Sequence, residues 1–206
     1  MFLTLSIQNR CFRLEKCFGK NENAHGTLLL YKSKDLKKWD YVHLLFEGDP
    51  KIDNSGIFWE MPVFKKIEDK YVLLVNRVPN KGIPARTQYW VGKFENEKII
   101  PYSPLPRNLE VINRLLSPSV IETSDGLITA IAIIPDEIGA EANYKQGWAH
   151  LYSIPRVWNL KKNGKIAQSP HPVLKQLREN CQLYKEKTIE NTSVEIIYDH
   201  KHGSER

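Results

Sequence analysis

One carboxylate in this chain of 206 residues stands out because of its neighbours. Glu60 directly follows Trp59 within residues 58–64, Phe-Trp-Glu-Met-Pro-Val-Phe, an apolar run that predicts a β-strand. Desolvating an ionised carboxylate is costly, so burial beside an indole would raise the pKa of Glu60. A carboxylic acid that stays protonated near neutral pH can act as a general acid, which makes Glu60 a candidate catalytic residue. The alternative is that Glu60 caps a turn or pairs with a surface lysine.

The composition limits the kind of protein that the chain can form. Hydrophobic residues make up 41% and charged residues 26%, which is typical of a globular domain. The formal net charge is +6, but 30 basic residues are interspersed with 24 acidic ones, so we expect no nucleic-acid partner. The three cysteines form no Cys-x-x-Cys pair, which argues against a disulfide framework and a zinc site. We therefore expect neither a metal ion nor another cofactor.

The sequence contains no apolar run of the ~18–20 residues that a membrane span needs, so we expect no membrane partner. The start of the chain lacks the basic region and the full apolar stretch of a signal peptide. Localisation therefore stays open, and the chain as it stands would be cytoplasmic.

Three similar stretches recur at a spacing of roughly sixty residues and predict a repeated β-unit. Each consists of a β-rich run followed by a polar turn, at residues 26–31, 88–94 and 147–154. Hairpins precede the second and third runs, at residues 61–75 and 119–134, the latter around an Asp-Gly turn. Each unit is thus predicted to be a four-stranded antiparallel sheet, and radial repetition of such sheets makes a propeller.

The first unit lacks its opening strand in this interpretation. Residues 1–7 would form its second strand, residues 26–31 its third, and residues 8–25 a polar loop. About two and a half blades are then visible, fewer than the four or more of a closed propeller. After Ile166 the β pattern stops, and residues 170–178 predict a turn and a short helix. We therefore divide the chain into a partial propeller domain (1–168) and a linker with a truncated C-terminal segment (169–206).

Four stretches together are similar to the motifs of one enzyme family. Residues 30–39 match a strand with a Ser-x-Asp-Leu-x-x-Trp turn, and residues 59–62 match Trp-Glu-Cys-Pro. Residues 89–94 are similar to the next outer strand, and residues 147–156 to a Gly-Trp…Ser-Leu-Pro-Arg signature. With these motifs the chain resembles glycoside hydrolase family 32, the group of invertases, levanases and inulinases.

The resemblance implies an all-β fold, part of a five-bladed β-propeller, with an active site in its central funnel. It implies retaining hydrolysis of β-fructosides such as sucrose, levan or inulin, so the partner would be a fructose-containing oligo- or polysaccharide. Retention needs two carboxyls about 5–5.5 Å apart, and the acid/base role would belong to Glu60. Trp59 would shield that carboxyl and contact the substrate. Ser117, which opens the first strand of the last blade, would also contact the sugar.

The chain departs from the family pattern at several positions. It contains neither the Asn-Asp-Pro-Asn-Gly motif of the nucleophile nor the Arg-Asp-Pro motif of the transition-state stabiliser. Both would lie upstream of Met1, which suggests an N-terminal truncation. Met61 stands where the family has Cys, Val63 where it has Asp, and Ile133 and Ile134 where it has Gly-Trp. The alternative function is therefore a catalytically inactive remnant or a carbohydrate-binding fragment, because one carboxyl cannot perform both displacements.

Other polar residues are predicted to have structural roles. Asp35 is expected in a turn, since Asp is a preferred turn residue. Asp136 and Glu137 could face the funnel, although a solvated loop is the favoured interpretation. His150 and Arg156 are expected to be structural.

Two further expectations concern the whole chain. An open ring would expose sheet edges and apolar blade faces, so we expect self-association. A weaker alternative is a neighbouring propeller family that cleaves arabinan or xylan.

Overall fold

The computed structural model describes residues 3–7, 10–16, 25–49, 56–78, 85–111, 115–136 and 138–178. The chain divides into two compact units, Met1–Pro172 and Val173–Arg206. Among the described residues, no helix is long and apolar enough to cross a lipid bilayer.

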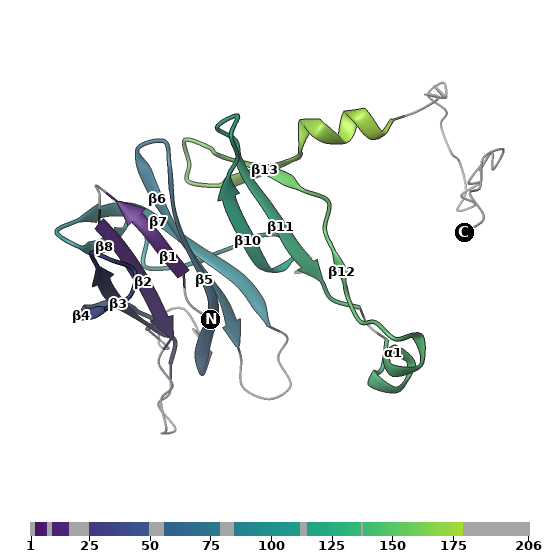
Figure 1. Ribbon diagram of the computed structural model, residues 1–206, viewed down its shortest axis with the longest axis horizontal. Helices are drawn as coiled ribbons and strands as arrows, with labels where there is room; N and C mark the ends of the chain where they lie inside the picture. Colours follow the sequence, from purple (N-terminus) through teal and green to yellow (C-terminus); the bar gives the residue numbers. More distant parts are fainter. Residues whose placement is uncertain are drawn as a thin grey trace. The chain divides into compact units, whose positions relative to one another are not determined.

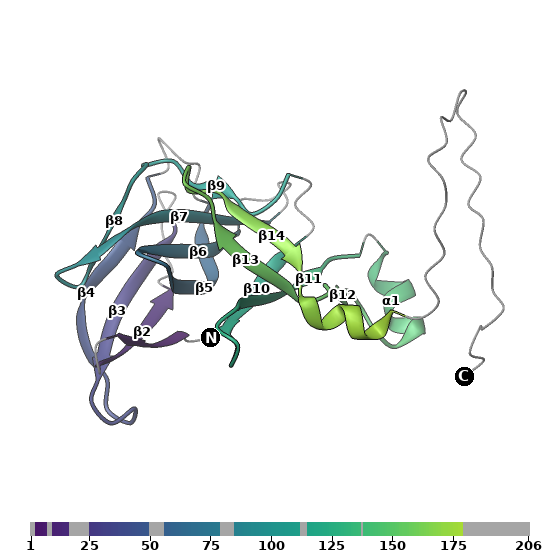
Figure 2. The ribbon, with the colours of Figure 1, turned by 90° about the horizontal axis from the view of Figure 1, so that it is seen from above.

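The strands of the first unit form three antiparallel sheets, each of which follows the chain order (Figures 1 and 2). The first sheet contains β1 (Leu3–Ile7), β2 (Arg10–Lys16), β3 (Thr27–Ser33) and β4 (Asp40–Glu47). The second sheet contains β5 (Phe58–Ile67), β6 (Lys70–Val78), β7 (Arg86–Glu95) and β8 (Lys98–Pro101), with β9 (Arg107–Asn108) paired to β7. The third sheet contains β10 (Leu116–Glu122), β11 (Ile128–Ile134), β13 (Arg156–Leu160) and β14 (Ile166–Pro170), with β12 (Leu151–Tyr152) paired to β11.

Consecutive four-stranded sheets of this kind are the blades of a propeller, and the described sheets do not close into a ring. The predicted all-β partial propeller is confirmed. The count of about two and a half blades is wrong, because the first sheet also has four strands and residues 3–7 form its first strand, not its second. Both predicted hairpins are also confirmed, β5–β6 around the turn at Glu68 and Asp69, and β10–β11 around Asp125 and Gly126.

Three local predictions from the sequence are wrong. Residues 8–25 are not simply a loop, because β2 occupies Arg10–Lys16 and pairs with both β1 and β3. The β pattern does not stop at Ile166, because β14 completes the third sheet. The run at 147–154 yields only the two-residue strand β12, and β13 takes the expected place beside β11.

Two helices complete the described structure. The short helix expected after the propeller is a 3₁₀ helix, η1 (Pro172–Leu177). The α-helix α1 (Ala140–Gln146) was not expected. Its sequence has good helix formers, a Glu141–Lys145 ion pair one turn apart and a left-handed Gly147 at its C-terminal cap.

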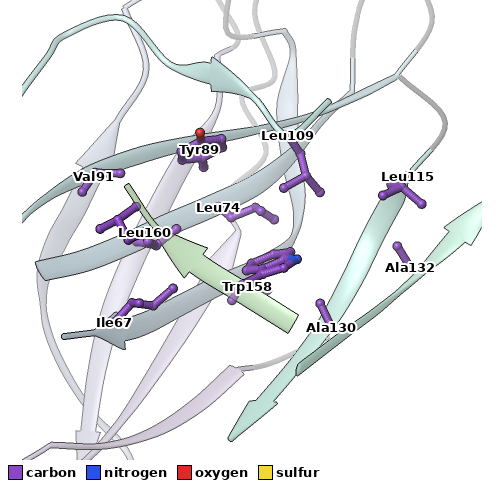
Figure 3. Packing of buried hydrophobic residues seen from close by; sticks show 12 residues of the cluster. Ile67, Leu74, Tyr89, Val91, Leu109, Leu115, Ala130, Ala132, Trp158 and Leu160 are labelled. Carbon is purple, nitrogen blue, oxygen red and sulfur yellow. The ribbon is translucent and has the colours of Figure 1, made fainter. Parts of the chain in front are cut away.

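Apolar side chains pack the sheets into two clusters, one involving the first and second sheets and one the second and third. Strand β6 contributes to both clusters, because Leu73 and Val75 belong to the first and Val72 and Leu74 to the second. All four have no exposed surface, as expected for a continuous apolar run in a strand buried on both faces. Burying each such side chain contributes roughly 1.5–3 kcal/mol. Figure 3 shows the second cluster, in which Trp158 from β13 lies among residues of the second and third sheets.

Candidate active site

The strand that contains Glu60 is interrupted by a β-bulge directly after this residue. Glu60 pairs with Asn76 of β6, whereas Met61 and Pro62 together lie opposite the single residue Val75. Met61 has a φ of 48°, although it precedes a proline, a position that favours extended backbone. Such a residue stores about 1–3 kcal/mol of strain, and bulges next to active sites re-aim side chains.

The third sheet repeats this bulge at the corresponding place in its first strand. Ser117 and Pro118 of β10 lie opposite the single residue Ala132 of β11. Ser117 has the same φ of 48° and also precedes a proline. The pairs Met61-Pro62 and Ser117-Pro118 are therefore equivalent in the two blades, a repeat that the outer strands alone did not reveal.

A row of polar residues crosses the second sheet at the position of Glu60. Glu60 of β5, Asn76 of β6 and Thr87 of β7 are directly opposite one another in register. Residues opposite each other in a sheet place their side chains on the same face. Asn76 and Thr87 are only 4% and 2% exposed, whereas Glu60 is half-buried.

Hydrogen bonds connect this row to Ser117 in the third sheet. The Asn76 Oδ1 atom accepts from the Ser117 backbone N–H at 3.0 Å, and Asn76 Nδ2 donates to the Ser117 hydroxyl. The Thr87 hydroxyl lies 2.6 Å from Asn76 Oδ1 and 2.8 Å from the carbonyl oxygen of Leu115, so its one proton is shared between two acceptors. We call Glu60, Asn76, Thr87 and Ser117 the inter-blade cluster. In this cluster, Asn76 lies between two of the predicted site residues: it is opposite Glu60 in the sheet and hydrogen-bonded to Ser117. The sequence did not single out Asn76.

The third predicted site residue, Trp59, lies in the protein core. It has no exposed surface, and its indole packs against the rings of Phe46 and Trp90 at centroid distances of 5.9 and 5.3 Å. A Cβ atom on Gly26 would lie 2.1 Å from the same indole, so this position has room only for glycine. Trp59 and Glu60 are successive strand residues and point to opposite faces of the sheet. A role for Trp59 in shielding Glu60 or contacting a substrate stays a prediction.

Asp35 is the turn residue that the sequence predicted. Its Oδ1 atom accepts backbone N–H groups of Lys37 and Lys38, both at 2.8 Å, and the Ser33 hydroxyl at 3.1 Å. These bonds, with Lys38 the largest contributor and Lys37 the next, lower the pKa of Asp35. The left-handed conformation of Leu36, with a φ of 61°, completes the turn.

Asp136 holds together the segment between β11 and β12. Its carboxylate accepts the backbone N–H of His150 at 2.6 Å, the backbone N–H of Ile138 at 3.2 Å and the side-chain amide of Asn143 at 3.3 Å. The bond from His150 is the main reason why the pKa of Asp136 is lowered. His150 therefore has the structural role that the sequence predicted for it.

We expect Asp136→Ala to loosen this segment, with tryptic cleavage after Lys145 about tenfold faster, because proteolysis follows local opening. Since the pKa of folded Asp136 is lowered, its stabilisation is complete at neutral pH and is lost only as the pH falls below about 4. Glu141→Ala is the control, because it removes only an exposed ion pair within α1. Equal cleavage rates for wild type and Asp136→Ala at pH 8 would contradict this role.

Within the described ranges, no group of three or more His, Cys, Asp or Glu side chains is placed to hold a metal ion. What the inter-blade cluster offers is a half-buried carboxyl next to hydrogen-bonding amide and hydroxyl groups. Asn76 and Thr87 were missed by sequence analysis. For Asn76, the sequence does contain a signal: an asparagine directly follows the apolar run 72–75. A polar side chain that is buried with such a strand needs hydrogen-bond partners, which marks it as a candidate for a polar cluster.

The described strands thus form a partial propeller whose second blade contains a half-buried carboxyl, Glu60, beside a bulge in its first strand. The sequence model of a protein family, the Glycosyl hydrolases family 32 N-terminal domain, matches residues 11–170 of this chain. The chain belongs to glycosyl hydrolase family 32, as its motifs indicated.

Similar proteins agree with this membership. The chain is 28% identical over 198 residues to a sucrose-6-phosphate hydrolase of Vibrio alginolyticus. The aligned region covers 88% of this chain and 39% of that protein. The structure of a family 32 beta-fructofuranosidase of Bombyx mori has a TM-score of 0.74 at 19% identity, over 87% of this chain and 38% of that one. That of a sucrose-6-phosphate hydrolase from Lactobacillus gasseri has a TM-score of 0.71 at 22% identity, over the same shares of the two chains. The chain thus spans about two fifths of the length of these relatives.

Proposed function

We propose that this chain provides the general acid/base of a retaining β-fructosidase, with Glu60 in that role. The observation that supports this most is the position of Glu60, at a bulge in β5 and in register with the buried Asn76. Glu60 would protonate the glycosidic oxygen as the leaving group departs. It would then deprotonate the water that hydrolyses the fructosyl-enzyme.

The nucleophile of this reaction is assigned to a part of the enzyme outside these 206 residues. A retaining mechanism needs a second carboxyl about 5–5.5 Å from the first. The sequence contains neither of the two aspartate motifs that the family uses upstream of the acid/base. A chain that spans about two fifths of its relatives is consistent with this division.

The proposed substrates are β-fructosides: sucrose, phosphorylated sucrose, levan or inulin. Relatives of this chain are named sucrose-6-phosphate hydrolase and beta-fructofuranosidase, and the Bombyx mori enzyme is described in complex with sucrose. These substrates share a fructosyl unit, which the acid/base would release.

A second candidate function is a non-catalytic fragment that binds fructosides. The absence of both aspartate motifs favours it, because a lone carboxyl cannot form and hydrolyse a covalent intermediate.

The test is hydrolysis of sucrose, sucrose 6-phosphate, levan and inulin by the enzyme that combines this chain with the part that supplies the nucleophile, with arabinan and xylan as controls. We expect release of fructose with the β-configuration formed first, observed by proton NMR before the anomers equilibrate. Binding of fructosides without turnover would favour the second candidate. Cleavage of the pentose polymers alone would contradict both.

A further inference from the structure

We propose that Asn76 is a positioning residue that orients the Ser117 hydroxyl beside Glu60, so that this hydroxyl donates a hydrogen bond to the bound sugar. This inference rests on the proposed function, because it assigns the sugar to the inter-blade cluster. Asn76 lies in β6, which is neither of the two bulged strands. It is opposite Glu60 of β5 in the sheet, and its side chain is hydrogen-bonded to Ser117 of β10.

The orientation of the Asn76 amide is fixed by its partners. The Ser117 backbone N–H can only donate, so the atom of Asn76 that it contacts at 3.0 Å is the oxygen. The Asn76 nitrogen therefore faces the Ser117 hydroxyl oxygen and donates to it. Burial to 4% exposure and the Thr87 hydroxyl at 2.6 Å hold the amide in this orientation.

This arrangement decides the direction of the Ser117 proton. A serine hydroxyl that accepts a hydrogen bond from Asn76 must direct its own proton elsewhere. Among the described residues, no acceptor for that proton is found, and Ser117 is half-buried rather than fully enclosed. Sugars offer hydroxyl oxygens as acceptors, so a bound fructosyl unit would supply the missing partner.

The strained backbone of Ser117 needs such a support. Its φ of 48° before a proline is unfavourable, and such conformations persist where surrounding contacts determine them. Asn76 supplies two of these contacts, one to the backbone and one to the side chain. Asn76 also pairs with Glu60 in the register of β5 and β6, so the residue that supports Ser117 lies directly opposite the proposed acid.

The chain contains a matched control contact between the same two strands. Lys65 of β5 donates to Glu122 of β10 at 2.8 Å, near the other ends of these strands. This ion pair also connects the two blades, but it lies outside the inter-blade cluster. Lys65→Met thus removes an inter-blade contact without altering the placement of Ser117.

The first measurement needs no ligand and compares the thermal unfolding midpoints of Asn76→Ala, Ser117→Ala and the double variant. We expect Ser117→Ala to lower the midpoint by a few degrees in the wild-type background and by almost nothing when Asn76 is already alanine, because the two form one unit. In the Lys65→Met background, Ser117→Ala should have its full effect. Fully additive shifts for Asn76 and Ser117 would overturn the proposal.

The second measurement separates positioning from a merely structural role through KM and kcat for a fructoside, measured on the enzyme that also contains the nucleophile. Asn76→Ala and Ser117→Ala should each raise KM about tenfold with a smaller change in kcat, and the double variant should be no worse than either. Lys65→Met should leave both constants unchanged. An unchanged KM in Asn76→Ala would overturn the positioning role even if the variant is less stable.

Asn76→Asp covers the case in which Asn76→Ala does not fold. The carboxylate keeps the acceptor for the Ser117 N–H but removes the Nδ2 donor, so the Ser117 hydroxyl turns to donate to the new oxygen. We expect a folded variant with the KM of Ser117→Ala, and a wild-type KM would overturn the proposal. A wild-type enzyme, with the nucleophile present, that neither binds nor cleaves any fructoside would refute the proposed function instead. The unfolding midpoints would still decide whether Asn76 and Ser117 act together.

Discussion

In the enzyme that also contains the nucleophile, Glu60→Gln is expected to lower kcat/KM for sucrose by a factor of about 10²–10⁴, equivalent to roughly 3–5 kcal/mol of transition-state stabilisation. Glutamine has almost the same size as glutamate, but its amide neither protonates a leaving group nor deprotonates water. Because Glu60 is half-buried at the edge of a bulge, the exchange should leave the unfolding midpoint within a few degrees of the wild type.

The leaving group provides a sharper form of this test. The leaving group of an aryl fructoside is weakly basic and needs little protonation as it departs. Glu60→Gln should therefore reduce the rate of fructosyl transfer from an aryl fructoside far less than the rate of fructosyl transfer from sucrose. Glu68→Gln is the matched control, because it makes the same exchange at the exposed turn after the same strand. Equal rates for Glu60→Gln and wild type on sucrose would remove Glu60 from the mechanism.

Trp59→Ala is expected to lower the free energy of unfolding by about 3–5 kcal/mol, which is typical for truncating a buried tryptophan. The indole has no exposed surface and contacts the rings of Phe46 and Trp90, which belong to different sheets. The tight fit of the indole against Gly26 shows that the region between the first two blades is closely packed. Removing the indole therefore leaves a cavity there.

Urea unfolding of the purified chain measures this loss. Trp148→Ala is the control, because its side chain is 52% exposed and its removal should change the stability by about 0.5 kcal/mol or less. A loss below about 1 kcal/mol for Trp59→Ala would show that the first and second sheets do not depend on this contact. The outcome also bears on Glu60, because Trp59 anchors the strand in which the acid lies.

Predictions from the sequence were most accurate where local chemistry decides the structure. The Asp125-Gly126 turn between two apolar runs predicted the β10–β11 hairpin, and the Ser-x-Asp motif predicted the turn held by Asp35. Local chemistry also misled, because β2 has the polar composition of a loop and becomes a strand by pairing on both sides. Strand formation depends on neighbours in the sheet more than on intrinsic preference.

The sequence by itself determined the family, the repeated blades and Glu60 as the candidate acid, since short motifs and apolar periodicity contain that information. Only the tertiary structure decided that Trp59 is a core residue and that Asn76 connects Glu60 to Ser117. The physical reason is distance along the chain. Asn76 and Ser117 are 41 residues apart, and their hydrogen bonds exist only once two separately formed blades pack against each other.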